Sequence, residues 1–182
     1  AQDIYLTGNP QITFFKVVYR RHTNFSMELI EQTINGSLAA SSRVTSTVSR
    51  NGDLVCVSYI KLAAVTALDS TNGNNLGHNM LDSVAVEIGG QLIDRQTGDW
   101  NAIWWNLTTP ESKVDSLRNS FVGQSGADES NYFYYPLNFW FCRNVGLALP
   151  LIALQYHEVD LKITYGSSSA FTRSPKVWID YI

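Results

Sequence analysis

Residues 158–165 alternate polar and apolar side chains without a fault. The apolar set is Val159, Leu161, Ile163 and Tyr165, and the polar set is Glu158, Asp160, Lys162 and Thr164. Successive side chains of a β-strand point to opposite faces, so this pattern predicts a half-buried strand with the apolar set inward. A shift by one residue would bury Asp160 and Lys162 instead, and the pattern therefore fixes which face is buried.

Similar strand signals recur along the chain. Gly89-Gly90 separates the alternating run Val84–Ile88 from Gln91–Ile93, which predicts a tight hairpin. Other segments rich in β-branched and aromatic residues are Ile12–Tyr19, Phe25–Ile34, Val44–Ser49, Leu54–Leu62, Tyr132–Cys142 and Lys176–Ile182. Clusters of Gly, Ser and Asn form the turns between them. These signals predict one all-β domain over residues 1–182, an eight-stranded antiparallel jelly-roll sandwich.

One region has the period of a helix instead. Trp100, Ile103, Trp104 and Leu107 form an apolar stripe at helical spacing, and Asp99 stands where a capping residue would. Thr109-Pro110-Glu111 then looks like a second helix start, with Val114, Leu117 and Phe121 on its apolar face and Gly123 at its end. The sequence thus predicts a short helical excursion, Asp99–Val122, between two strands.

The tryptophans of this excursion suggest how it is used. Trp100 and Trp104 lie on the apolar stripe and are predicted to pack on the sandwich. Trp105 is turned by about 100° from Trp104, so it is predicted to face a neighbouring subunit or an adjoining jelly roll. A sugar-stacking platform built from Trp100, Trp104, Trp105 and Asn106 is the alternative, and the helical spacing favours packing over it.

Composition favours an assembled protein over a solitary one. Charged residues make up 16% of the 182 residues, against about 25% in a typical soluble domain. The net charge is −3, which argues against direct packaging of nucleic acid, because that needs many cations. Lys16, Arg20, Arg21 and His22 form the longest basic cluster and are read as a solvated strand edge or as a salt-dependent contact with a neighbouring subunit. No apolar stretch approaches the ~20 residues of a transmembrane helix.

Signals for catalysis or metal binding are weak. The three histidines, His22, His78 and His157, have no His-x-His spacing, so no metal site is predicted. Neither cysteine, Cys56 nor Cys142, has a CxxC spacing or a convincing histidine partner, and both are read as reduced, buried, small apolar residues. No nucleophile elbow or phosphate-binding loop occurs. We therefore predict a protein that is not an enzyme and needs no cofactor.

Three long segments resemble one protein family in the expected order. They are AQDIYLTGNPQITFFK (residues 1–16) running on to YRRHTNF (19–25), VEIGGQLID (86–94) followed by Gly98-Asp99-Trp100, and PLNFWFCRN (136–144) followed by GLALPLIAL (146–154). The chain resembles the major capsid proteins of nucleocytoplasmic large DNA viruses. It holds only the first of the two jelly rolls that the resemblance implies, and 177–182 is similar to the last strand of that roll.

The resemblance implies a structural role in a virion. Three copies are expected to form a pseudo-hexagonal tile of an icosahedral shell, in contact with neighbouring capsomers and minor capsid proteins. An inner viral membrane is expected nearby, and assembly is expected in the host cytoplasm. The candidate subunit-interface residues are Trp105, Lys16, Arg20 and Arg21. The alternatives are a single-jelly-roll minor or penton capsid protein, which would form pentamers, and a carbohydrate-binding jelly-roll module.

Overall fold

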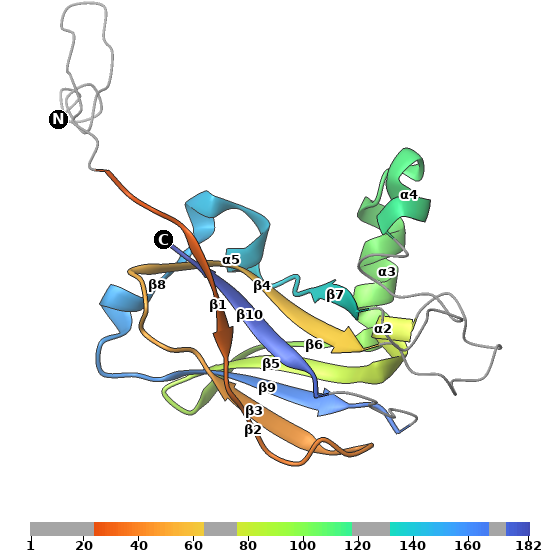
Figure 1. The fold of residues 1–182 in the computed structure, drawn as a ribbon, viewed down its shortest axis with the longest axis horizontal. Coiled ribbons are helices and arrows are strands. Elements are labelled where there is room, and N and C mark those ends of the chain that lie inside the picture. The colour runs from red at the N-terminus through yellow and green to blue at the C-terminus, as the bar shows by residue number, and fades with distance from the viewer. Residues whose placement is uncertain (1–23, 64–75, 118–131, 168–173) are drawn as a thin grey trace, which may run out of the picture.

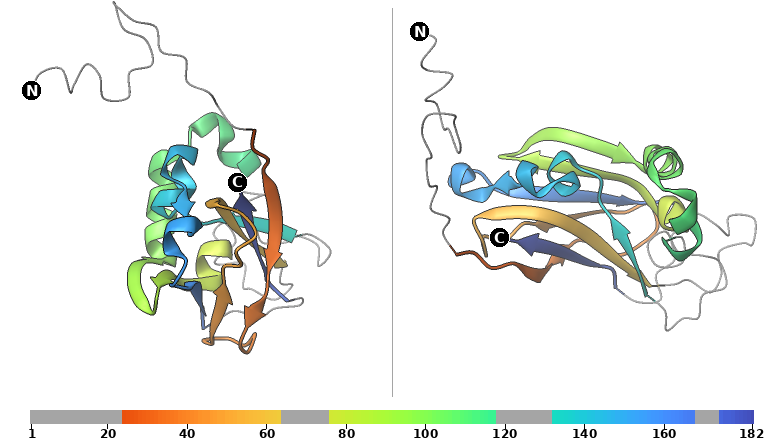
Figure 2. Two further views of the ribbon diagram at one scale, coloured as in Figure 1. Left: turned by 90° about the vertical axis from the view of Figure 1, so that its left-hand side faces the viewer. Right: turned by 90° about the horizontal axis from the view of Figure 1, so that it is seen from above.

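A computed structural model of the chain describes residues 24–63, 76–117, 132–167 and 174–182. The predicted strand at 12–19 lies outside these residues. Two antiparallel sheets pack face to face (Figures 1 and 2). The first has the order β1 (Glu28–Gln32), β10 (Lys176–Tyr181), β4 (Leu54–Ala63) and β7 (Tyr132–Pro136), with β8 (Leu149–Pro150) also paired to β4. The second has the order β2 (Ile34–Asn35), β3 (Arg43–Thr47), β9 (Val159–Tyr165), β5 (Leu81–Ile88) and β6 (Gln91–Thr97).

The strand order is that of a jelly roll. Along the chain, β1, β4, β7 and β10 belong to one sheet, and β3, β5, β6 and β9 to the other, so the chain passes repeatedly between the two layers. The two remaining strands, β2 and β8, are two residues long. The predicted fold class, an eight-stranded antiparallel jelly-roll sandwich with a helical excursion, is confirmed.

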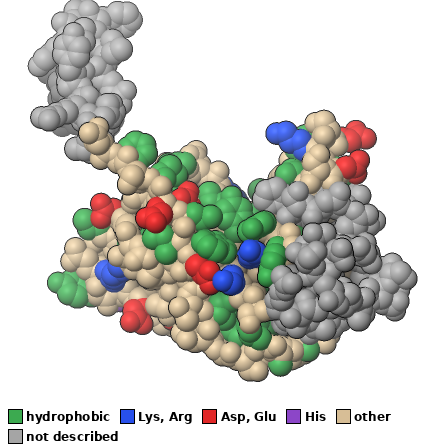
Figure 3. Space-filling model, in the orientation of Figure 1, with side chains coloured by type: hydrophobic (Ala, Val, Ile, Leu, Met, Phe, Trp, Pro, Cys, Tyr) green, Lys and Arg blue, Asp and Glu red, His purple; other side chains and the backbone are tan. Residues whose placement is uncertain are grey.

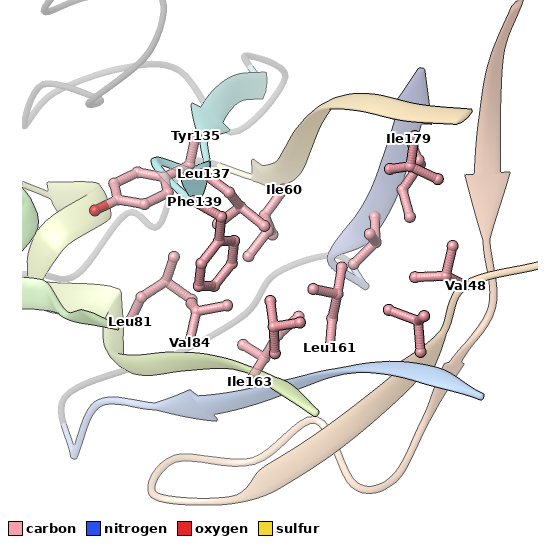
Figure 4. Packing of buried hydrophobic residues seen from close by; sticks show 14 of the residues in the cluster. Val48, Ile60, Leu81, Val84, Tyr135, Leu137, Phe139, Leu161, Ile163 and Ile179 are labelled. Atoms are coloured by element: carbon pink, nitrogen blue, oxygen red, sulfur yellow. The ribbon is translucent and has the colours of Figure 1, made fainter. Parts of the chain in front are cut away.

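The core between the sheets follows the alternation of β9. Val159, Leu161, Ile163 and Tyr165 are buried, whereas the residues between them are half-buried on the outer face. Leu161 and Ile163 face the apolar side chains of the opposite sheet, among them Ile60 and Ile179 (Figure 4). The predicted orientation of this strand is therefore confirmed.

The predicted hairpin joins β5 to β6. Gly89 and Gly90 both have positive φ angles, of 59° and 79°, which is the backbone of the tight turns that favour glycine. A Cβ atom on Gly89 would also lie 2.7 Å from Nδ1 of His157. The exposed His157 side chain could move to make room, so the positive φ angle is the main reason for glycine at this position.

Two predicted strands are divided. Phe25–Ile34 becomes β1 and β2, which lie in different sheets and are separated by Thr33. Tyr132–Cys142 is a strand only as far as Pro136, and α5 (Trp140–Arg143) follows. The alternation of buried residues persists through Phe139 and Phe141, although the backbone has left the sheet. The pattern thus predicted correctly which side chains are buried. It predicted the extent of the strand wrongly, because side-chain burial alone does not show whether the backbone pairs with another strand.

Helices gather at one end and one side of the sandwich (Figures 1 and 2). Helix α2 (Leu76–Met80) leads into β5, and α3 (Gly98–Thr108) follows β6. Helix α4 (Glu111–Leu117) follows α3, as the Thr109-Pro110-Glu111 signal predicted. Its predicted end, with Phe121 and Gly123, lies outside the described residues. Two short 3-10 helices, η3 (Val145–Leu147) and η4 (Leu151–Leu154), lie between α5 and β9.

Candidate assembly surface at the helical excursion

Helix α3 meets the sandwich through a polar face. Asn101 is 2% exposed and is the most deeply buried non-glycine residue of the helix. Its Oδ1 accepts a hydrogen bond of 3.3 Å from Nδ2 of Asn138, which follows β7. The Asn101 side chain also hydrogen-bonds the phenol of Tyr135 on β7. The helix is therefore attached by amide and phenol groups rather than by its apolar stripe.

A second set of bonds extends this attachment to α2. His78 belongs to α2 and is buried, and its Nδ1 lies 2.7 Å from the hydroxyl of Tyr135. The two rings meet edge to face, with their centroids 5.3 Å apart. Three elements that are distant in the sequence, α2, α3 and β7, are joined through the Tyr135 hydroxyl.

Burial sets the protonation of this group. It lowers the pKa of His78 to about 4, because the charged imidazolium would lose its hydration. Burial also raises the pKa of Tyr135 well above its ordinary value. At neutral pH both rings are therefore uncharged, and the hydrogen bond between them joins two neutral groups.

Gly98 allows the close approach of α3 and α2. A Cβ atom at Gly98 would overlap the backbone carbonyl oxygens of His78 and Leu81. The helix is capped by Thr97, whose Oγ1 accepts a 3.2 Å hydrogen bond from the backbone N–H of Trp100. Asp99, predicted as the cap, lies instead inside the first turn, where its carboxylate suits the helix dipole.

A pocket of about 140 Å³ opens beside this attachment. Its lining combines aromatic rings with amide, imidazole and hydroxyl groups, from His78, Asn101, Trp104, Trp105, Thr108, Thr109, Tyr135, Pro136 and Asn138. Arg143 of α5 stacks over Trp104, with 4.5 Å between the guanidinium carbon and the ring centroid. Trp104 and Trp105 therefore both border the space between the helix and the sandwich.

The apolar stripe of α3 points away from the body. Trp100 is 45% exposed, Ile103 53% and Leu107 78%. The prediction that Trp100 packs on the sandwich is wrong, because Gly98 and Asn101 orient the helix with another face toward the body. The contact of Trp105 with a neighbour stays a prediction. Trp104, which is half-buried, does border the body, as predicted. The outward apolar residues Trp100, Ile103 and Leu107 are named here the α3 stripe.

One of the four sequence-predicted interface residues lies in the part of the chain that the structure describes. Trp105 is half-buried in the pocket wall. Lys16, Arg20 and Arg21 lie outside the described residues, and their role at an interface stays a prediction. The α3 stripe could be recognised in the sequence from its helical spacing. The signal for the direction of the helix was Gly98, because residues 98, 101, 105 and 108 share one helix face and Gly98 allows that face to approach its neighbours closely.

Titratable groups elsewhere form no reactive cluster that the structure describes. Within residues 24–63, 76–117, 132–167 and 174–182, no three His, Cys, Asp or Glu side chains gather as metal ligands would. Cys56 is buried and Cys142 half-buried, and both are free thiols. Burial raises the pKa of Cys142 to about 11, which keeps it a thiol. His157, two residues before β9, is exposed. No helix in these ranges has the length and apolarity to cross a membrane.

Sandwich topology, a polar attachment of the helical excursion and an outward apolar stripe define a structural jelly-roll domain. Comparison with known proteins identifies the family to which this domain belongs. The model of the major capsid protein N-terminus matches residues 13–182, and the chain belongs to this family. As predicted, the family is one of structural capsid proteins, which are components of the virion, and not of enzymes.

Relatives and solved structures agree with this assignment. The chain is 47% identical to the major capsid protein of Pyramimonas orientalis virus, over all of this chain and 50% of that protein. It is 42% identical to the major capsid protein of Paramecium bursaria Chlorella virus 1, over all of this chain and 45% of that protein. A quasi-atomic model of the capsid of the latter virus contains a chain that matches with a TM-score of 0.77 at 37% identity, over 93% of this chain and 45% of that one. The chain thus spans about half the length of these relatives.

Proposed function

We propose that this chain is the first jelly roll of a major capsid protein whose copies form homotrimers. Each trimer would be a pseudo-hexagonal tile in the icosahedral shell of a large DNA virus, assembled in the host cytoplasm. The match to a chain of a virus capsid model at a TM-score of 0.77 carries this proposal. The stiffness of two antiparallel sheets packed face to face suits such a tile.

The α3 stripe is the contact that the proposal assigns to assembly. An exposed apolar stripe costs free energy in water and gains it when a neighbour covers it. The hydrogen bonds of Asn101 hold the helix in place, so covering the stripe would cost little additional conformational entropy. Symmetric assembly repeats one contact many times, and a modest stripe is then sufficient.

The residues named from the sequence keep a place in the proposal. Trp105 would act from the pocket wall, beside the α3 stripe. Lys16, Arg20 and Arg21 would form a salt-dependent contact with a neighbouring subunit, as basic groups do at the rim of an interface. Neighbouring capsomers and minor capsid proteins are the further proposed partners, and an inner membrane would lie nearby. Direct contact with nucleic acid is not proposed, given a net charge of −3.

Light scattering on the purified full-length protein tests the proposal. We expect a mass of three chains. A mass of five would favour the penton alternative, and a single chain at every concentration would contradict assembly through this protein. Raising the salt concentration should weaken the trimer if the basic residues contribute, and the triple variant K16Q/R20Q/R21Q should remove that salt dependence.

A further inference from the structure

The pocket beside α3 is lined by uncharged groups. It combines two indole rings, two side-chain amides and two hydroxyl groups, from Trp104, Trp105, Asn101, Asn138, Thr108 and Thr109. His78 also borders it, and burial keeps the pKa of this ring at about 4, so the ring is uncharged in neutral solution. The tip of the helical excursion differs, because α4 carries exposed acidic and basic side chains (Figure 3). The pocket thus suits a polar ligand without charge.

Part of this lining holds the fold together, and part is available to a ligand. The Asn101 side chain is hydrogen-bonded to Asn138 and to the phenol of Tyr135. The Thr109 hydroxyl and the Trp105 indole N–H have no hydrogen-bond partner among the residues that the structure describes. The pocket lining therefore has a hydroxyl group and an N–H donor that can bind a ligand without breaking a bond of the fold.

The volume of the pocket, about 140 Å³, matches one six-membered ring. A protein cavity of about 150 Å³ with purely apolar walls stays dry and holds benzene. A polar pocket of this size is hydrated instead, and a ligand displaces the water without loss only if it reproduces the hydrogen bonds of that water. A ring that carries hydroxyl groups meets this requirement, and an apolar ring does not.

The two tryptophans supply the remaining element of recognition. The face of an indole ring is electronegative, and it attracts the C–H groups that a pyranose ring presents on one side. Arg143 already stacks over Trp104, with 4.5 Å between the guanidinium carbon and the ring centroid, so Trp105 is the better candidate for stacking on a ligand. Of the residues that the sequence suggested for a sugar-stacking platform, Trp104 and Trp105 line the pocket, whereas Trp100 and Asn106 do not.

We infer that the pocket binds one pyranose unit of a neutral glycan, with Trp105 stacking on the sugar ring and the Thr109 hydroxyl bonded to one of its hydroxyl groups. A site of this size binds a single sugar weakly, with a dissociation constant of about 1 mM. Repetition of the domain in a shell would compensate for that weakness, because many weak sites act together on a surface that carries many sugars. The site itself needs no oligomer, so the inference goes beyond the proposed function and does not rest on it.

Calorimetric titration of the full-length protein with the methyl glycosides of glucose, mannose, galactose and N-acetylglucosamine tests the inference. Trp105→Ala removes the stacking ring. Thr109→Val removes the hydroxyl and keeps the shape of the side chain, and the extended backbone of this residue suits valine. Tyr156→Ala is the matched control, because Tyr156 is an aromatic residue that is 95% exposed and lies outside the pocket. Thermal melts and light scattering record the fold and the mass of each variant.

We expect at least one of the four glycosides to bind the wild type and Tyr156→Ala equally. Trp105→Ala should bind it at least tenfold more weakly, and Thr109→Val about fivefold more weakly. Thr109→Val decides the case if Trp105→Ala does not fold.

The inference would be overturned if the wild type bound none of the glycosides, or if neither pocket variant weakened the binding. Binding of phenol in place of the glycosides would also overturn it, because the pocket would then select an apolar ring. The masses report the proposed trimer separately, so failure of the inference and failure of the proposed function give different results.

Discussion

Nδ1 of His78 and the hydroxyl of Tyr135 lie 2.7 Å apart, and this bond joins α2 to β7 beneath the helical excursion. The histidine is 8% exposed and its Nε2 has no hydrogen-bond partner among the described residues. A proton added to this ring would bring a charge into an environment that hydrates it poorly. Acid should therefore loosen the excursion.

The first prediction concerns pH. The pKa of His78 is about 4 when folded, below the ordinary value of about 6.5, so the unfolded chain binds the proton more readily. The stabilising contribution is complete above pH 6.5 and is lost as the pH falls from about 6.5 to about 4. We expect a loss of about 3 kcal/mol in free energy of unfolding from this group, measured by urea titration.

Variants separate His78 from other acid effects. His78→Asn should flatten the pH dependence between 6.5 and 4, whereas the exposed His157→Asn should leave it unchanged. If the stability of His78→Asn depends on pH between 6.5 and 4 as strongly as that of the wild type, the buried histidine is not the cause of the acid sensitivity.

The second prediction concerns Gly98. Gly98→Ala should destabilise the protein by about 1–3 kcal/mol, or more if α3 detaches, because its methyl group meets two backbone carbonyls that cannot yield. Gly146→Ala is the matched control, since its nearest neighbour, Oδ1 of Asn144, lies 3.5 Å away, and it should change stability by less than about 0.5 kcal/mol. Thermal melts measure both, and similar melting temperatures for the two variants would argue against the close approach.

The third prediction concerns the register of β9. Leu161 is 1% exposed, so Leu161→Ala should cost about 2–5 kcal/mol, and Leu161→Asp should abolish soluble folding. Thr164→Ala on the outer face should cost less than about 1 kcal/mol. A well-folded Leu161→Asp protein, seen by circular dichroism, would contradict the assigned inward face.

Particular residues show which features of the structure could be predicted from the sequence. The alternation of β9 and the Gly89-Gly90 turn depend on neighbours in the chain, and both were predictable. The direction of α3 was not, because it is decided by Asn101 and Gly98 meeting residues from α2 and β7. An apolar stripe normally marks the buried side of a helix. Here it marks the exposed side, which we propose a neighbour covers, and that distinction depends on surroundings that a local pattern does not contain.

The fourth prediction concerns the α3 stripe. Leu107→Asp should leave the melting temperature of the monomer nearly unchanged, since Leu107 is 78% exposed, while it raises the dissociation constant of the trimer. A charge buried in an apolar contact commonly costs several kcal/mol, so we expect at least a tenfold effect. Ser112→Asp, on the exposed surface of α4, is the control. Equal sedimentation profiles for the two variants would show that the α3 stripe is not part of the interface.

We propose that this domain tiles a virus shell through contacts with its own copies. Cryo-electron microscopy of assembled particles tests it most directly, by locating the two sheets and α3 in the density. We predict three copies of the full-length protein in each tile, with the α3 stripe covered by a neighbour. Particles whose shell lacks this fold, or tiles in which the α3 stripe faces only solvent, would contradict the account.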